Sequence, residues 1–182
     1  IKTGGKQYRV QPGDVIVVTQ KIVSKAEGRV VRFQDVEASS LALAITEGHR
    51  RDPRHTELIL RESERIVRMD RGVIISQTRH GFVCANAGVD ASNVPGDDSV
   101  CLLPVDSDAS AQRVRAIVKQ RTGFDVAVVI SDTFGRPWRN GAANVAIGVA
   151  GLDPLLSYVG QADSHGKLMH TTVIAVADEL AA

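Results

Sequence analysis

The sequence lacks the features that set specialised classes of protein apart. Of its 182 residues, two are cysteine and 4% are aromatic, and no apolar run approaches the ~18–20 residues that a membrane-spanning helix needs. The first residues do not have the pattern of a signal peptide. Basic and acidic residues number 22 and 21, so the net charge of +1 gives no general attraction for nucleic acid or for an anionic membrane. These absences predict a cytoplasmic protein that neither spans a membrane nor binds nucleic acid as its main activity.

What is present is typical of a globular chain. Hydrophobic residues make up 43% and charged residues 24%, which suits one ordinary domain or two small domains that share a core. Cys84 and Cys101 both lie among apolar neighbours, and two cysteines make neither a disulfide scaffold nor a zinc-finger pattern. We therefore expect two buried, reduced thiols.

Hydrophobic periodicity predicts a mixed α/β fold. Strands are expected near residues 14–19, 73–75, 82–84, 100–105, 126–130 and 145–149, and the last segment, 171–182, begins as a strand and ends as a helix. The first strand has no polar alternation, which predicts that both of its faces are covered. One helix is expected to begin at Asp52 and to reach Met69, with Glu57 on its solvated face. A second helix is expected from Ser107, as its cap, to Gly123.

Asp132 is the strongest single candidate for a functional side chain. With Thr133 it follows the apolar segment 126–130, and open α/β sheets bind ligands at the carboxyl ends of their strands. A carboxylate and a hydroxyl together are ligands that Mg²⁺ takes in nucleotide-binding enzymes. The alternative is that Asp132 only caps the turn that follows it.

The loop at residues 135–141 adds groups that recognise anions. Two arginines, Arg136 and Arg139, stand beside Asn140 and Trp138. Guanidinium groups make two-point contacts with phosphate or carboxylate oxygens, and the flanking glycines let backbone N–H groups approach an anion. The sequence therefore favours an anionic ligand here over a packed surface loop that Trp138 anchors.

Two further clusters supply oxygen ligands and positive charge. Asp90 and Asn93 lie close together in a turn-rich segment, so one rigid turn can direct both toward an ion, although turns also use these residues for local reasons. Lys21 and Lys25 follow the first expected strand, where a lysine can meet a phosphate group, although the chain has no P-loop motif. Asp90 together with Asp132 would supply the two carboxylates of a metal site.

Several segments taken together resemble one known family, the coenzyme F420-0 γ-glutamyl ligases. They occur in the family's order, at residues 13–29, 78–90, 92–96, 130–141 and 175–180. The resemblance implies an unusual α/β fold in an intertwined homodimer. It also implies a reaction in which GTP drives the joining of L-glutamate to the phospholactyl tail of a deazaflavin coenzyme precursor. An acyl phosphate intermediate is implied, with Mn²⁺ or Mg²⁺ and with K⁺ as a further cation.

The expected site residues fall into three groups. The metal ligands that the resemblance implies are Asp90, Asp132 and Thr133. The expected nucleotide contacts, with Lys21 added from its position after the first strand, are Gln20, Lys21, Lys25 and Asn93. The residues expected to act in catalysis are Asp132, Arg136 and Arg139.

The chain departs from the family pattern in several places. Ala142 and Val173 stand where glutamine and glutamate are common in the family. The family continues beyond the equivalent of Ala182 into a segment that supplies another metal ligand. Residues 13–182 are therefore expected to form a ligase-like domain that is truncated at its C-terminus.

The start of the chain has a different likeness. Residues 1–10 resemble the opening of a bacterial large-subunit ribosomal protein, so residues 1–12 are expected to be an atypical segment. Basic residues around Tyr8 could contact RNA phosphates, while a strand with a Gly-Gly turn is the simpler alternative. Two functions stay open: a GTP- and metal-dependent amide ligase, and a non-catalytic ligase-like domain that contacts RNA through residues 1–10.

Overall fold

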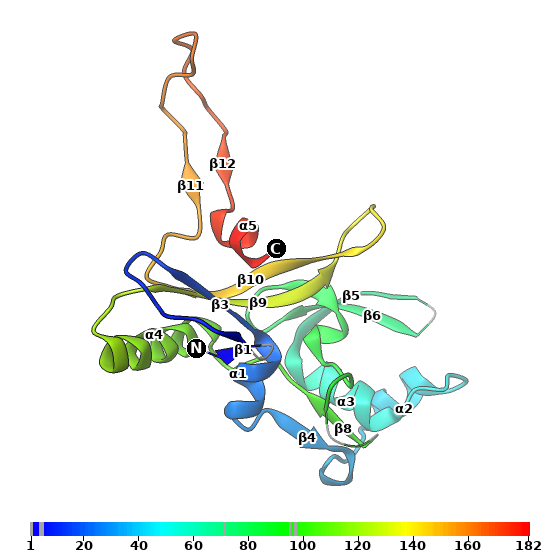
Figure 1. Ribbon diagram of the computed structural model, residues 1–182. Helices are drawn as coiled ribbons and strands as arrows, with labels where there is room; N and C mark the ends of the chain where they lie inside the picture. Colours follow the sequence, from blue (N-terminus) through cyan, green and yellow to red (C-terminus); the bar gives the residue numbers. More distant parts are fainter. Residues whose placement is uncertain (1, 4–5, 71, 95, 97) are drawn as a thin grey trace. The chain divides into compact units, whose positions relative to one another are not determined.

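The computed structural model describes residues 2–3, 6–70, 72–94, 96 and 98–182. They form two compact units, and Figure 1 shows the elements of each. The first unit comprises Ile1–Thr19, Asp106–Thr133 and Ala143–Ala182, and the second comprises Gln20–Val105 and Phe134–Ala142. Helices and strands both contribute, which confirms the mixed α/β prediction. Within the described residues, no helix has the length and apolar character needed to cross a bilayer.

A three-stranded sheet in the order β10–β9–β3 forms the centre of the first unit. β3 (Val15–Thr19) runs parallel to β9 (Ala127–Gly135), and β9 carries buried valine and isoleucine side chains. β3 lies at one edge of this sheet, and its residues Val15 and Val17 are 38% and 43% exposed, so the prediction that both of its faces are covered is wrong. Its β-branched run reflects strand propensity rather than burial on two sides.

β9 and β10 (Ala142–Ala150) are longer than the sequence predicted. β9 does not end at residue 130 but continues to Gly135, which shortens the expected polar loop to residues 136–141. The parallel pairing with β3 ends at Ser131, opposite Thr19. Asp132 therefore lies inside β9 rather than in a turn after it. It is also the first residue of β9 beyond the part that pairs with β3.

Helix α4 (Ser107–Thr122) was predicted and is present, with one change at its start. The N-cap is Asp106 rather than Ser107, since the Asp106 carboxylate accepts a 2.8 Å hydrogen bond from the Ala109 amide. Gly123, at φ 77°, ends the helix in the left-handed conformation that glycine adopts readily. The sequence thus predicts both ends of α4 to within one residue.

β10 passes very close to the first turn of α4 at Gly148. A Cβ atom on Gly148 would lie 2.4 Å from the backbone carbonyl of Ser107, a distance that no real side chain tolerates. Beside this contact, the Val149 amide donates a 2.7 Å hydrogen bond to Asp108 Oδ1. The absence of a side chain at Gly148 therefore lets the strand and the helix share a hydrogen bond.

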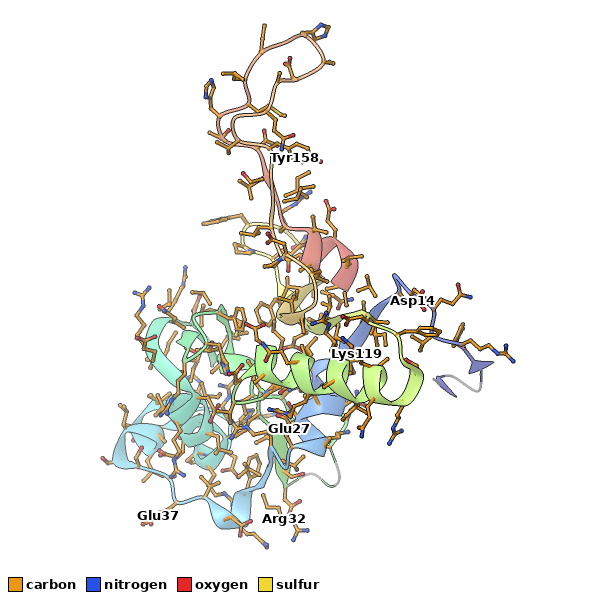
Figure 2. The ribbon with its side chains drawn as sticks, turned by 90° about the vertical axis from the view of Figure 1, so that its left-hand side faces the viewer. Asp14, Glu27, Arg32, Glu37, Lys119 and Tyr158 are labelled. Atoms are coloured by element: carbon orange, nitrogen blue, oxygen red, sulfur yellow. The ribbon has the colours of Figure 1, made fainter. Side chains whose placement is uncertain are left out.

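A long two-stranded arm extends away from the sheet of the first unit (Figure 1). β11 (Leu156–Ser157) and β12 (Val173–Ile174) pair antiparallel, and further backbone hydrogen bonds, such as Gly160 N to Met169 O at 2.8 Å, continue the ribbon. Figure 2 shows side chains standing out on both sides of the ribbon near Tyr158. The second strand of the arm, β12, falls in the segment predicted to begin as a strand, whereas no element was predicted for β11.

The C-terminal segment matches its prediction of a strand followed by a helix. β12 leads into α5 (Val176–Ala181), and the Ala146 amide of β10 donates a 2.8 Å hydrogen bond to Asp178 Oδ1 in this helix. At the other terminus, β1 (Lys2–Thr3) and β2 (Lys6–Gln7) pair antiparallel, as the strand interpretation expected. The predicted Gly-Gly turn between them lies outside the described residues.

The second unit is built from short helices and two small sheets. Its helical elements are α1 (Gln20–Ala26), η1 (Phe33–Asp35), α2 (Ser40–Thr46), α3 (Pro53–Glu62) and η2 (Asn86–Gly88). Its antiparallel sheets are β5 (Ser63–Asp70), β6 (Val73–Thr78) and β7 (Val83–Ala85), and separately β4 (Val30–Arg32) and β8 (Ser99–Cys101). One cluster of buried side chains joins them: Phe33, Val36, Leu58, Ile59, Ile74, Ala87, Val89, Val100 and Leu102.

Helix α3 begins as predicted but ends much earlier. Asp52 caps it, accepting a 2.8 Å hydrogen bond from the Arg54 amide. The helix stops at Glu62, and the residues up to Met69 form β5, whose Met69 lies opposite Ile74 of β6. The apolar spacing that predicted a continuing helix belongs instead to a strand, because pairing with β6 outweighs local helical periodicity. Glu57 is also buried rather than solvated.

Candidate functional site

The loop of residues 86–94, here called the Asp90 loop, has a tightly constrained backbone. Gly88 and three non-glycine residues of the loop adopt positive φ angles. A Cβ atom at Gly88 would lie 2.8 Å from Cγ of Leu103, so glycine is required for space as well as for conformation. The Asp90 and Cys101 backbones exchange hydrogen bonds of 3.1 and 2.8 Å. Main-chain contacts therefore hold the backbone of Asp90 in place independently of the contacts of its side chain.

Polar groups surround the Asp90 carboxylate. Lys21 Nζ lies 2.5 Å from Oδ2, the Ser92 amide donates to Oδ1 at 2.7 Å, and the Ser92 hydroxyl donates to Oδ2 at 2.9 Å. Burial by itself raises the pKa of Asp90, but the hydrogen bonds from Lys21 and Ser92 outweigh it and hold that pKa below its usual range. Asp90 is therefore an ionised carboxylate at neutral pH.

Two lysines on one face of α1 hold the Asp90 loop. Lys21 contacts Asp90 and also donates to the Ser92 carbonyl at 3.0 Å, and Lys25, one helical turn later, donates to the Asn93 carbonyl. The structure thus brings together four residues that the sequence placed in one site, although Lys21 and Asp90 are far apart along the chain. The lysine contacts seen here are with the loop itself.

Gln20 lies at the start of α1 and is buried. Its amide group donates to Ser24 Oγ at 2.7 Å and to the Leu102 carbonyl at 3.1 Å. These bonds tie α1 to the segment that follows β8, next to the backbone partner of Asp90. Within this structure Gln20 orients the helix that carries both lysines.

The first unit holds Asp132 and Thr133, which are adjacent in β9. Asp132 is half-buried, and the exposed Thr133 hydroxyl donates a 2.8 Å hydrogen bond to Asn144 Oδ1 on β10. Among the described residues, no group of three or more His, Cys, Asp or Glu side chains is arranged to hold a metal ion.

The two candidate arginines lie at the exposed tip between β9 and β10. Arg136 donates to the Asn140 carbonyl, and the Arg139 amide bonds the Arg136 carbonyl at 3.4 Å. Trp138 is 102% exposed, so the alternative in which it anchors a packed loop is wrong. Near the base of the tip, the Phe134 ring packs edge-on against Phe82, with centroids 5.9 Å apart.

Sequence reasoning missed two residues that support the Asp90 loop, His55 in α3 and Arg51 just before that helix. His55 packs beside Phe33 and hydrogen-bonds the Val89 backbone, and burial lowers the pKa of His55, which keeps the ring neutral. Arg51 donates a 3.1 Å hydrogen bond to Asn86 Oδ1. No sequence pattern links these distant residues. By contrast, a serine two residues after an aspartate, as in Asp90 and Ser92, is a recognisable turn signal.

The two cysteines are as predicted. Cys84 and Cys101 are both free thiols and both buried, Cys84 in β7 and Cys101 in β8.

A family model described as F420-0:Gamma-glutamyl ligase matches residues 2–182 of this chain. The chain belongs to this ligase family. Its relatives include a protein named coenzyme F420:L-glutamate ligase from Methanothermobacter thermautotrophicus, 50% identical over 171 residues, which are 93% of this chain and 67% of the relative. Proteins of the same name from Methanopyrus kandleri and Methanocaldococcus jannaschii are 43% and 41% identical, over 94% and 96% of this chain and 68% and 70% of their own lengths.

The F420-0:gamma-glutamyl ligase family match takes in both compact units. It begins at residue 2, so it also includes most of the segment that resembles a ribosomal protein. The candidate residues on the Asp90 loop, on α1 and on β9 all fall within it.

Proposed function

We propose that this chain is a GTP-dependent ligase that joins L-glutamate to the phospholactyl carboxylate of a deazaflavin coenzyme F420 precursor. Its family and the names of its relatives support glutamate ligation. The observation that carries the proposal onto this chain is the Asp90 carboxylate, held ionised by Lys21 and Ser92 on a loop that α1 steadies. A metal-bound nucleotide needs an ionised carboxylate as a ligand for the metal and positively charged side chains beside its phosphates.

The proposed chemistry takes two steps. A carboxylate oxygen of the deazaflavin precursor attacks the γ-phosphorus of GTP, so that an acyl phosphate forms and GDP leaves. The α-amine of L-glutamate then attacks the acyl carbon. The new C–N bond forms as the C–O bond to phosphate breaks, inorganic phosphate departs, and the amine gives up a proton.

The basic residues of the chain have clear parts in this proposal. Lys21 and Lys25 carry the positive charge that nucleotide phosphates need, and Asn93 lies beside them on the Asp90 loop. Arg136 and Arg139 are exposed at a hairpin tip, where a guanidinium group is accessible to an anionic substrate. Gln20 acts indirectly, as the buried residue that positions α1.

A divalent cation, Mn²⁺ or Mg²⁺, is proposed as part of this chemistry, with Asp90, Asp132 and Thr133 as its candidate protein ligands. These donors fit such an ion, because all of them are oxygens and the Asp90 carboxylate is ionised. Mg²⁺ commonly takes only one or two protein carboxylates and completes its shell with water and phosphate. When bound, the cation would neutralise phosphate charge. K⁺ is proposed as an additional ion without assigned residues.

The arm gives a physical reason to propose a homodimer. Its large apolar side chains are unusually exposed, with Leu155 at 53%, Val159 at 50%, Leu168 at 57% and Val173 at 48%. An isolated two-stranded ribbon is at best marginally stable in water. A second copy of the chain that covers these side chains would take them out of water and would stabilise the ribbon.

The test of the ligase proposal is an assay with GTP, Mn²⁺, L-glutamate and the precursor labelled with ¹⁸O in its carboxylate. We expect a product heavier by one glutamyl unit and one ¹⁸O atom in the inorganic phosphate for each amide formed. Reactions without glutamate, or with ATP in place of GTP, are the controls. Unlabelled phosphate would exclude the acyl phosphate, and no product from folded protein would favour the non-catalytic alternative.

A further inference from the structure

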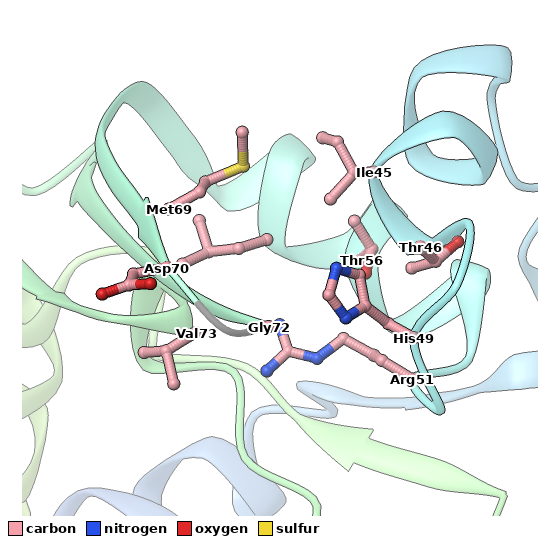
Figure 3. A pocket seen from close by; sticks show the side chains of 10 residues that line it. Ile45, Thr46, His49, Arg51, Thr56, Met69, Asp70, Gly72 and Val73 are labelled. Atoms are coloured by element: carbon pink, nitrogen blue, oxygen red, sulfur yellow. The ribbon is translucent and has the colours of Figure 1, made fainter.

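A cavity of about 180 Å³ lies within the second unit, and Arg51, which lines it, hydrogen-bonds Asn86 at the start of the Asp90 loop. It is bounded by α2, the loop after α2, α3 and the hairpin of β5 and β6. Figure 3 shows His49, Arg51 and Thr56 on one side of it, and Met69 and Val73 on the hairpin side. A more open hollow of about 420 Å³ adjoins it and shares His49 and Arg51. The cavity is therefore accessible to small molecules.

Arg51 contributes a positive charge that lacks a carboxylate partner. Its side chain extends toward the hairpin (Figure 3), and its Nη1 atom donates to the amide oxygen of Asn86 at 3.1 Å. Within the described part of the chain, no Asp or Glu forms an ion pair with it; Asp70, which also lines the cavity, pairs with Arg68 at 3.3 Å. Burial lowers the pKa of Arg51, which reflects the cost of holding this cation partly out of water. An anion in the cavity would offset that cost.

Thr56 contributes a hydroxyl group that has no partner of its own. Its side chain is fully buried, it lines the cavity, and among the described residues its Oγ1 atom forms no hydrogen bond. A buried hydroxyl without a partner costs free energy, so most such groups in proteins are satisfied. Beside Arg51, which has no ion-pair partner among the described residues, it is a second and independent sign that a polar ligand belongs here.

The size and walls of the cavity limit the ligand. Pockets for drug-sized molecules are usually ~300–1,000 Å³, so a cavity of about 180 Å³ is too small for a nucleotide or a deazaflavin. Ile45, Met69 and Val73 add an apolar wall, which suits a short aliphatic chain better than a bare inorganic anion. The combination fits a carboxylate on a molecule about as large as an amino acid.

We propose that this cavity binds a small aliphatic carboxylate, L-glutamate in particular, with Arg51 and Thr56 holding one carboxylate group. The choice of L-glutamate rests on the proposed ligase function, whereas the carboxylate chemistry rests on the cavity alone. A guanidinium group and a hydroxyl are both donors, and a carboxylate offers two oxygens to accept from them. The apolar wall would pack against the methylene groups.

The test measures binding of L-glutamate to the whole chain by calorimetry and ligand-observed NMR, with and without Mn²⁺ and a non-hydrolysable GTP analogue. Glutarate and inorganic phosphate are the comparison ligands. We expect saturable binding at millimolar concentrations, weakened about tenfold or more by Arg51→Gln and by Thr56→Val, since hydrogen bonds to charged groups have this strength. Thr56→Val should not lower thermal stability, because it removes a hydroxyl without partners.

Matched controls separate this site from general effects. Ser76→Ala removes another buried hydroxyl without a described partner, outside the cavity, and Arg65→Gln removes an exposed charge on the same hairpin. Both should leave glutamate affinity unchanged. Equal affinity in all variants, or binding of phosphate but of neither carboxylate, would overturn the proposal. Nucleotide binding in the same samples reports separately on the ligase function, because Thr56→Val, which removes no contact with the Asp90 loop, should leave it intact.

Discussion

Asp90 is the single residue on which the account of the site depends most. Its side chain is 47% exposed, yet it accepts hydrogen bonds from Lys21 and from both the amide and the hydroxyl of Ser92. This combination leaves an ionised carboxylate that a ligand can reach. The sequence identified Asp90 and Lys21 by residue type and position, but it could not show that they are paired, since no local pattern records a contact between distant segments.

The pKa of Asp90 leads to a prediction about stability in acid. Because that pKa is lower in the folded chain than its ordinary value, the stabilisation is fully present above about pH 4 and is lost as the pH falls through the lower folded value. We expect the free energy of unfolding to decline less steeply below about pH 4 in Asp90→Asn than in the unaltered chain. Urea unfolding at a series of pH values measures this.

Other acidic residues set the background for that experiment. The pKa values of Asp52 and Glu57 are also lowered, mainly by side-chain hydrogen bonds from Arg54 and Ser39 respectively. Asp52 and Glu57 contribute the same acid dependence to Asp90→Asn and to the unaltered chain. The difference between the two slopes of unfolding free energy against pH therefore reports on Asp90 alone. Identical slopes would contradict the contacts described for its carboxylate.

At the scale of the element, the contact between β10 and α4 is the most demanding in the fold. Gly148 carries no side chain, and the strand backbone approaches the Ser107 carbonyl closely as a result. We expect Gly148→Ala to lower the free energy of unfolding by about 1–3 kcal/mol, the usual cost of forcing extra atoms into a packed region. Thermal or urea unfolding checks this.

Gly135 is the matched control for that substitution. It too lies in a strand, β9, and a Cβ atom there would meet nothing within 4 Å. Gly135→Ala should leave stability unchanged or slightly raised. If the two substitutions have the same effect, the close approach at Gly148 does not constrain the fold.

The elements also show where sequence patterns are reliable. Asp52 and Gly123 mark helix ends through chemistry that acts over a few residues, and both predictions are confirmed. The continuation of α3 to Met69 was wrong, because apolar spacing cannot reveal that β6 is available as a pairing partner. Local signals therefore predicted caps and strand cores, and missed features that depend on a distant partner.

At the scale of the whole molecule, the exposed apolar arm carries a prediction about assembly. We expect the chain to be a dimer in light scattering or sedimentation, and Leu168→Glu to shift it toward monomer by placing a charge among apolar side chains. Ser164→Glu, at an exposed polar position of the same arm, should leave the dimer intact. A monomeric unaltered chain would contradict the proposed homodimer.

The resemblance in sequence captured the family of the whole molecule, and the mixed α/β class followed from periodicity alone. Two small domains were one of the alternatives, but the stretches that make up each compact unit and the pairing of β11 with β12 in the arm could not be predicted, because both arise from contacts among separate parts of the chain. The residues of the cavity beside Arg51 and Thr56 were missed for the same reason. Neither residue type is unusual by itself, and only their placement around one space makes them informative.

The most direct test of the central claim compares the rate of amide formation in Asp90→Asn with that in Asp35→Asn, an exposed position away from the Asp90 loop. Both changes remove one negative charge and keep the shape of the side chain. Replacing residues that only support a metal ligand costs ~10–100-fold, so we predict a loss of at least about tenfold for Asp90→Asn and none for Asp35→Asn. An unimpaired Asp90→Asn enzyme would show that the Asp90 loop does not carry the ligase reaction.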